Sequence, residues 1–136
     1  MNPSTPAARE EIAVPGLSPA ISHYTDAVRF GNLLFVSGLT AHDASGTLVG
    51  GEDAAAQTEQ ILVNLGKVLA AAGADFGDVL KVTVYLTDVA DRTKINPVRQ
   101  RHFGTSKPAS TLVGVRELAL PGMKVEIEAV VGLPSA

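Results

Sequence analysis

The stretch Lys124-Val125-Glu126-Ile127-Glu128-Ala129-Val130-Val131 decides what kind of fold this chain can form. Its odd-numbered residues are all aliphatic, whereas three of the four even-numbered residues are charged. A period of two residues predicts a β-strand with one face against a core. The two carboxylates on the other face are two positions apart, which places them roughly 6–7 Å from each other.

Glu126 and Glu128 allow two interpretations, because acidic side chains fit poorly in the middle of a sheet. They could belong to a solvated sheet face or to cross-strand ion pairs. One of them could instead be a general acid or base that points into a pocket. The surrounding sequence has to separate these interpretations.

Segment 79–87 repeats the alternating pattern, with Val82, Val84 and Leu86 on one face and polar side chains on the other. Two more strands are predicted at 27–30 and 33–38, where a Gly-Asn pair between apolar runs indicates a hairpin turn. A further strand is predicted at 108–115. These segments therefore form a sheet with one aliphatic face and one polar face.

A long helix is predicted between the strand at 33–38 and the strand at 79–87. Asp53 is a suitable N-cap, an aliphatic stripe with spacings of three and four runs to about Ala72, and Gly73 is suited to end the helix. The Gln-Thr-Glu segment at 57–59 is expected to be exposed in the first turns.

A second, short helix is predicted from Pro97 to Phe103. Asn96 is favoured as its N-cap and proline is favoured at the first helical position. Five basic residues and no acid occur between Arg92 and Lys107. This segment could hold phosphates or a carboxylate, or it could be a solvated helix face that balances an acidic protein.

The order of these elements predicts an α+β fold in which two helices cover one face of a mixed sheet. The polar face then needs a partner, which indicates an oligomer. At 136 residues the chain is most simply a single domain, here assigned to residues 18–136. The proline-containing residues 1–17 are expected to be a flexible, extended lead-in.

Composition excludes several classes of site and partner. Cysteine is absent, so disulfides, thiolate metal sites and a cysteine nucleophile are excluded. His23, His42 and His102 have no metal-ligand spacing, and no glycine motif for nucleotides occurs, so neither a metal nor a cofactor is expected. A net charge of −3 argues against general nucleic-acid binding. No membrane span or signal peptide is evident, so a cytoplasmic protein is expected.

Taken in order, several short motifs make the chain similar to the RidA/YjgF family of reactive-intermediate deaminases, also called the L-PSP family. The similarity extends from about Ser18 to Val131. The matching parts include LLFVSG at 33–38, AAQT at 55–58, the strand 79–88, Lys107-Pro108-Ala109, and LPGMKVEIEA at 120–129, and it is their order that makes the resemblance specific.

The resemblance implies a chorismate-mutase-like α+β fold, a homotrimer with pockets at subunit interfaces, and hydrolysis of a small-molecule enamine or imine to a carbonyl compound and ammonia. Three residues match the catalytic positions of the family: Tyr24, Asn96 and Glu126. Four match or flank its substrate-binding positions: Ser37, Gly38, Ser110 and Thr111. Under this resemblance Glu126 positions or activates water, and Glu128 is a supporting acid.

One departure from the family changes the expected substrate range. Family members with imine deaminase activity usually read Pro-Ala-Arg where this chain reads Pro108-Ala109-Ser110. That arginine binds the substrate carboxylate through two parallel hydrogen bonds, which a serine does not reproduce. A neighbouring Arg99, Arg101 or Arg116 could replace it. His23, in place of a family proline, is expected near the pocket.

Three functions remain open on the sequence. The first is a deaminase with an altered substrate range. The second is a non-catalytic trimer that binds ligands or acts like a chaperone, with Glu126 in a structural role. The third is an endoribonuclease, for which the basic segment 92–107 is the only support.

Overall fold

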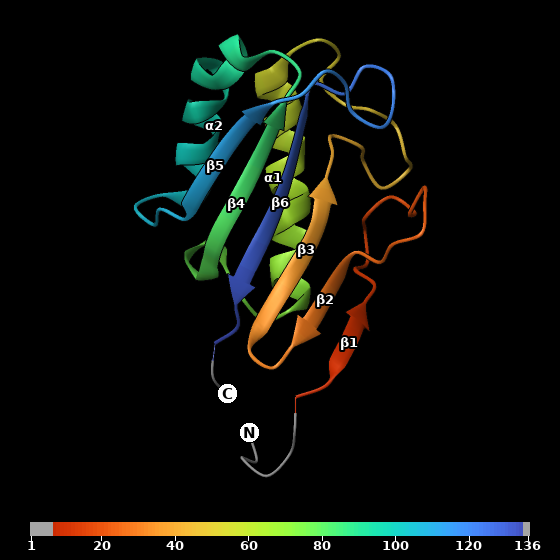
Figure 1. Cartoon of the computed structure of the whole chain (residues 1–136), viewed down its shortest axis with the longest axis vertical. Helices are drawn as coiled ribbons and strands as arrows, with labels where there is room; N and C mark the ends of the chain where they lie inside the picture. Colours follow the sequence, from red (N-terminus) through yellow and green to blue (C-terminus); the bar gives the residue numbers. More distant parts are fainter. Residues whose placement is uncertain (1–6, 135–136) are drawn as a thin grey trace.

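The computed structural model describes residues 7–134 and consists of a six-stranded sheet with two helices packed on one face (Figure 1). The strands are β1 (Arg9–Ile12), β2 (Ala27–Phe30), β3 (Leu33–Leu39), β4 (Val79–Leu86), β5 (Ala109–Gly114) and β6 (Val125–Gly132). The helices are α1 (Ala54–Ala71) and α2 (Arg92–Phe103), with short 3-10 turns at Phe76–Asp78 and Val89–Asp91. The predicted α+β class and the arrangement of the two helices are confirmed.

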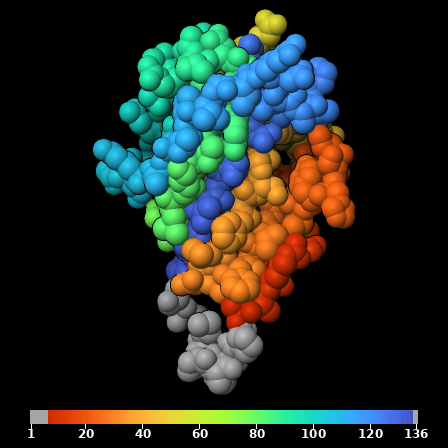
Figure 2. Space-filling model, in the orientation of Figure 1, coloured from red at the N-terminus to blue at the C-terminus, as the bar shows by residue number. Residues whose placement is uncertain are grey.

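The sheet order is β1-β2-β3-β6-β4-β5, so the strand that carries the two glutamates lies at its centre. β6 is antiparallel to both β3 and β4, and β4 is parallel to β5. Helices α1 and α2 therefore make the two crossovers between parallel strands. Within residues 7–134, no helix covers the opposite face of the sheet, which is the face in view in Figure 2.

The alternating pattern of β6 has the predicted consequence for the core. Its odd-numbered side chains are all buried against α1, whose Ile61, Leu65 and Val68 are 0–1% exposed. The capping of α1 is also as predicted. The Asp53 carboxylate accepts hydrogen bonds from the backbone N–H groups of Ala55 (2.9 Å) and Ala56 (3.3 Å).

Two predicted boundaries are wrong. Helix α2 begins at Arg92 rather than Pro97, so Asn96 is not an N-cap and Pro97 lies inside the helix. The 3-10 turn before α2, capped by Asp88, leads directly into the helix and overrides the Asn-Pro signal. At the other end of the chain, residues 9–12 of the predicted flexible lead-in pair with β2 as an edge strand. Residues 1–6 of that lead-in lie outside the described residues.

The expectation of an exposed segment 57–59 is also wrong, because Gln57 and Thr58 are fully buried. The Gln57 amide nitrogen donates to the carbonyls of Gly51 (2.7 Å) and Gly122 (2.9 Å). Its amide oxygen accepts from the Lys124 backbone N–H (2.8 Å). Gln57 therefore fixes the loop that leads into β6 against the start of α1.

We expect Gln57→Ala to lower the free energy of unfolding by about 2–4 kcal/mol, because three backbone groups lose their partner inside the protein. Urea denaturation at a fixed protein concentration measures the change. The control is Gln100→Ala on the exposed side of α2, for which a change within about 0.5 kcal/mol is expected. Equal effects of the two variants would contradict this role of Gln57.

Candidate functional site

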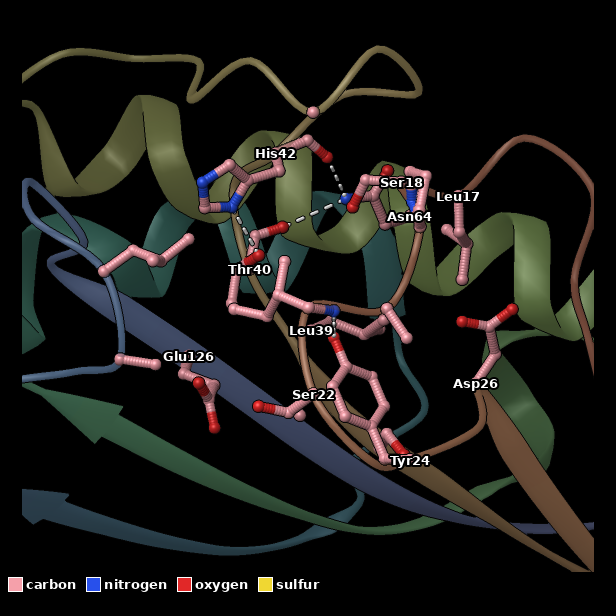
Figure 3. Close-up of a pocket in the computed structure, with 18 of the residues that line it drawn as sticks. Leu17, Ser18, Ser22, Tyr24, Asp26, Leu39, Thr40, His42, Asn64 and Glu126 are labelled. Atoms are coloured by element: carbon pink, nitrogen blue, oxygen red, sulfur yellow. Dashed lines mark hydrogen bonds between the residues drawn. The ribbon is translucent and has the colours of Figure 1, made fainter.

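A cavity of about 620 Å³ opens beside Glu126, at one end of the central strands. Its walls come from the loop 17–24, from the end of β3 and the residues after it, and from the loop 119–123. Figure 3 shows the side chains around it, with Glu126 at one side and Asp26 at the other. Four of the predicted site residues line this single cavity: Tyr24, Ser37, Gly38 and Glu126.

Glu126 and Glu128 have different environments although they lie on the same strand face. Glu126 is half-buried in the cavity, and burial raises its pKa, with a smaller contribution from the charge of Glu128. Glu128 is exposed and accepts a hydrogen bond from the Tyr85 hydroxyl. Only Glu126 combines a cavity, partial burial and a pKa moved toward neutrality, which is the environment of a proton-transfer group.

Gly38 lies directly against the Glu126 side chain. A β-carbon added at this position would be 2.8 Å from Glu126 Cδ, so no larger residue fits without moving the carboxyl group. The pairing of β3 with β6 shifts register between Val36 and Leu39, which is where Gly38 lies. Such bulges redirect side chains next to active sites.

Ser37 joins β3 to residues 25–26, and Tyr24 directly precedes these residues at the cavity wall. The Ser37 hydroxyl donates to the Thr25 carbonyl (2.6 Å), and its backbone N–H donates to the Asp26 carbonyl (3.0 Å). The Tyr24 hydroxyl accepts from the Ile21 backbone N–H at 3.4 Å, and the residue remains 46% exposed. Tyr24 therefore presents an accessible aromatic face at the edge of the cavity.

A polar group that was not predicted lies on another wall of the cavity and is formed by Thr40, His42 and Asn64. The Thr40 hydroxyl is 2.7 Å from His42 Nδ1, and the Asn64 amide donates to the carbonyls of Thr40 (3.0 Å) and His42 (2.9 Å) (Figure 3). Thr40 and His42 follow Gly38 at intervals of two residues. Extending the strand alternation of β3 beyond Gly38 would therefore have placed both side chains on the same face as Gly38. His23, in contrast, does not line the cavity.

Asn96, Ser110 and Thr111 lie apart from this cavity. Asn96 is exposed on α2. Ser110 pairs with Val82, whose side chain is buried under the helices, so Ser110 faces the helix side of the sheet. Glu126 is on the opposite face and two strands away. One chain therefore does not bring Glu126 and Ser110 together.

Thr111 lies on the sheet face that no helix covers. Its hydroxyl accepts a hydrogen bond from the Lys81 ammonium group (2.6 Å), and its register partner is Thr83 on β4. The predicted site residues thus form two groups within one chain. The first surrounds the cavity, and the second lies at β5 and α2.

Comparison with known proteins assigns the chain to a family. A family model described as Endoribonuclease L-PSP matches residues 16–132, which is most of the chain. The chain belongs to this family, RidA/YjgF. The family resemblance seen in the sequence is thereby confirmed.

Individual RidA/YjgF proteins are similar over nearly their whole length. A RutC family protein from Pyrococcus horikoshii is 41% identical over 123 residues, covering 90% of this chain and 96% of that protein. The bovine protein named 2-iminobutanoate/2-iminopropanoate deaminase is 40% identical over 124 residues, covering 90% of this chain and 88% of the bovine protein. The crystal structure of the Escherichia coli YjgF gene product matches with a TM-score of 0.83 and 31% identity, over 90% of this chain and 98% of that one.

Two further features of this RidA/YjgF protein concern possible ligands and surroundings. Within residues 7–134, no three potential metal-ligating side chains of His, Asp or Glu gather at one place. In the same part of the chain, none of the helices has the length and apolar character needed to cross a bilayer.

Proposed function

We propose that this RidA/YjgF protein hydrolyses a reactive enamine or imine to a carbonyl compound and ammonia. The observation that carries the proposal is the half-buried Glu126 carboxyl group, which lies against Gly38 in a cavity and has a raised pKa. The name of the bovine relative, an imine deaminase that is 40% identical, supports the same chemistry.

In the proposed reaction, the ionised Glu126 takes a proton from water while the water oxygen forms a bond to the imine carbon. Glu126 passes this proton to the imine nitrogen, which gives a neutral carbinolamine and restores the carboxylate. The carboxylate then takes the hydroxyl proton as the carbonyl bond forms and the carbon–nitrogen bond breaks, and it passes that proton to the departing nitrogen, which leaves as ammonia. Tyr24 and Ser37 orient the substrate in the cavity, and Asn96 contributes from the second group of residues.

We further propose that the protein is a homotrimer with its pockets at subunit interfaces. The uncovered sheet face exposes large apolar side chains, since Phe30 and Phe35 are 52% and 47% accessible. In the proposed closed ring of three heterologous contacts, the β5 edge of one subunit lies against the cavity of the next. Light scattering should then give a mass three times the 14.0 kDa of one chain.

The activity is tested with 2-iminobutanoate that is generated in the assay and used before it hydrolyses on its own. We expect ammonia and the keto acid to form faster than in buffer with the same concentration of albumin. A rate equal to the buffer rate would instead favour a non-catalytic trimer that binds ligands.

RNA cleavage has less support than deamination. The basic segment 92–107 does not form a continuous row of free cations. Lys94 is 3.4 Å from the Asp91 carboxylate and Arg101 is 4.0 Å from that of Glu59, so two of its five cations lie beside carboxylates. The family description names an endoribonuclease, so the absence of salt-sensitive RNA binding at low salt would remove this alternative.

A further inference from the structure

The cavity wall formed by Thr40, His42 and Asn64 has no part in the proposed reaction. Thr40 and His42 come just after β3, both are half-buried, and both line the same cavity as Glu126. The Thr40 hydroxyl is 2.7 Å from His42 Nδ1, but within residues 7–134 no group hydrogen bonds to His42 Nε2. No buried side-chain nitrogen or oxygen of these residues lacks a partner, so Nε2 is accessible. The wall therefore has polar groups that the chain itself leaves unused.

Asn64 holds this wall in place from helix α1. Its amide nitrogen donates to the carbonyls of Thr40 (3.0 Å) and His42 (2.9 Å), and its oxygen accepts from the Gln60 amide (3.0 Å). Asn64 is 4% exposed. Because both amide hydrogens and the oxygen are already used, Asn64 is a positioning residue, and contacts to a ligand fall to Thr40 and His42.

The Thr40–His42 pair offers one donor and one acceptor, whichever ring nitrogen carries the proton. If the hydroxyl donates to Nδ1, the Nε2–H group is the free donor and the hydroxyl oxygen is the free acceptor. If Nδ1–H donates to the hydroxyl oxygen, the hydroxyl hydrogen is the free donor and Nε2 is the free acceptor. A neutral imidazole supplies no charge in either state. The pair therefore matches an uncharged group that both donates and accepts, as a hydroxyl does.

The cavity has room for a substrate that reaches this wall. Its volume of about 620 Å³ lies within the range of about 300–1,000 Å³ that is typical of sites for drug-sized ligands. A molecule as small as 2-iminobutanoate fills only part of such a space. Figure 3 shows Thr40 and His42 next to each other, above Glu126 in this view.

We propose that Thr40 and His42 form a subsite that selects substrates whose side chain ends in a hydroxyl group. The inference rests on the proposed function, because the same molecule presents its enamine or imine carbon to Glu126. The substrate hydroxyl accepts from one member of the pair and donates to the other. An aliphatic side chain of the same size leaves both members without a partner, so it binds more weakly.

The experiment is a calorimetric titration of the intact protein with two stable keto acids of equal size, 4-hydroxy-2-oxobutanoate and 2-oxopentanoate. The two differ only in a terminal hydroxyl in place of a methyl group. We expect the wild type to bind the hydroxylated compound at least about 10-fold more tightly, the effect of two neutral hydrogen bonds. Thr40→Val and His42→Phe should each reduce this ratio to about threefold or less, while the affinity for 2-oxopentanoate stays within about twofold.

Ser22→Ala is the matched control, because Ser22 carries another hydroxyl in the lining of the same cavity, and its ratio should equal that of the wild type. Thermal unfolding checks that the variants are folded. A variant that binds 2-oxopentanoate as the wild type does has an intact cavity, so its ratio reports on the hydroxyl alone. A wild type without a preference for the hydroxylated compound would overturn the subsite, as would an unchanged ratio in either Thr40→Val or His42→Phe.

The outcome is independent of the test of the proposed function. A binding preference that both variants remove, without imine hydrolysis, would retain the subsite and remove the deaminase activity. Hydrolysis of 2-imino-4-hydroxybutanoate and 2-iminopentanoate with equal kcat/KM, together with equal binding of their keto acids, would retain the activity and remove the subsite. If both proposals hold, His42→Phe lowers kcat/KM for the hydroxylated imine and leaves that for 2-iminopentanoate unchanged.

Discussion

Replacing Glu126 with glutamine should slow ammonia release by about 10²–10⁴-fold, the range of a proton-transfer group. Glutamine preserves the size of the side chain and can still hydrogen bond to water, but it cannot accept the proton of an attacking water molecule. The rate is measured with 2-iminobutanoate, and light scattering checks that the assembly is unchanged. Glu128→Gln is the matched control, because Glu128 is exposed and hydrogen-bonded to Tyr85. Unchanged turnover in Glu126→Gln would rule out a catalytic role.

The raised pKa of Glu126 also predicts how rate and stability depend on pH. The proposed reaction needs the ionised form of Glu126, so the rate should rise with pH through the raised pKa. A carboxyl group with a raised folded-state pKa favours folding below its unfolded-state pKa, and this contribution is lost as pH rises through the folded-state pKa. Glu126→Gln should therefore have a higher Tm than the wild type at neutral pH, with a difference that shrinks toward acidic pH.

Gly38→Ala should lower the deaminase rate by about 10²-fold, the effect of moving a reacting group by about 1 Å. The added methyl group would be 2.8 Å from Glu126 Cδ and 3.1 Å from Cγ. These atoms belong to the far end of a flexible side chain, so the chain can fold while the carboxyl group is displaced. Kinetics with 2-iminobutanoate and urea denaturation measure the two effects separately.

Gly66→Ala on α1 is the matched control for Gly38→Ala. A β-carbon at Gly66 would be 3.7 Å from the Phe76 ring, which is an ordinary contact. Alanine is favoured over glycine in a helix by up to about 1 kcal/mol, so this variant should be at least as stable as the wild type and fully active. Full activity of Gly38→Ala would show that the position of the Glu126 carboxyl group is not limiting.

The parts of the fold that could be predicted from the sequence are those with a local cause. The alternation in 79–86 and 125–132 reflects one buried face of each strand, and the Asp53 cap and the glycine turn at 31 depend only on near neighbours. Strand β1 was missed because its sequence, Arg-Glu-Glu-Ile, is mostly polar and pairs only at the sheet edge.

The parts that could not be predicted depend on partners that are distant in sequence. Burial of Gln57 follows from its bond to the carbonyl of Gly122, 65 residues away. The cavity was only partly foreseen, because the contact of Gly38 with Glu126 requires the pairing of β3 with β6. Glu126 and Ser110 are separated because β5 lies at the edge of the sheet, two strands from β6. Matching single residues to a family motif does not reveal the order of the strands.

The central position of β6 has a consequence for how the protein is made. Strands β3 and β4 are synthesised before β6, yet each of them pairs with β6 and they do not pair with each other. While the chain emerges, its two halves expose unpaired strand edges that favour association with other chains. Insertion of β6 closes the sheet and at the same time carries Glu126 to Gly38, so a nascent chain acquires its proposed proton acceptor only in the step that completes its core.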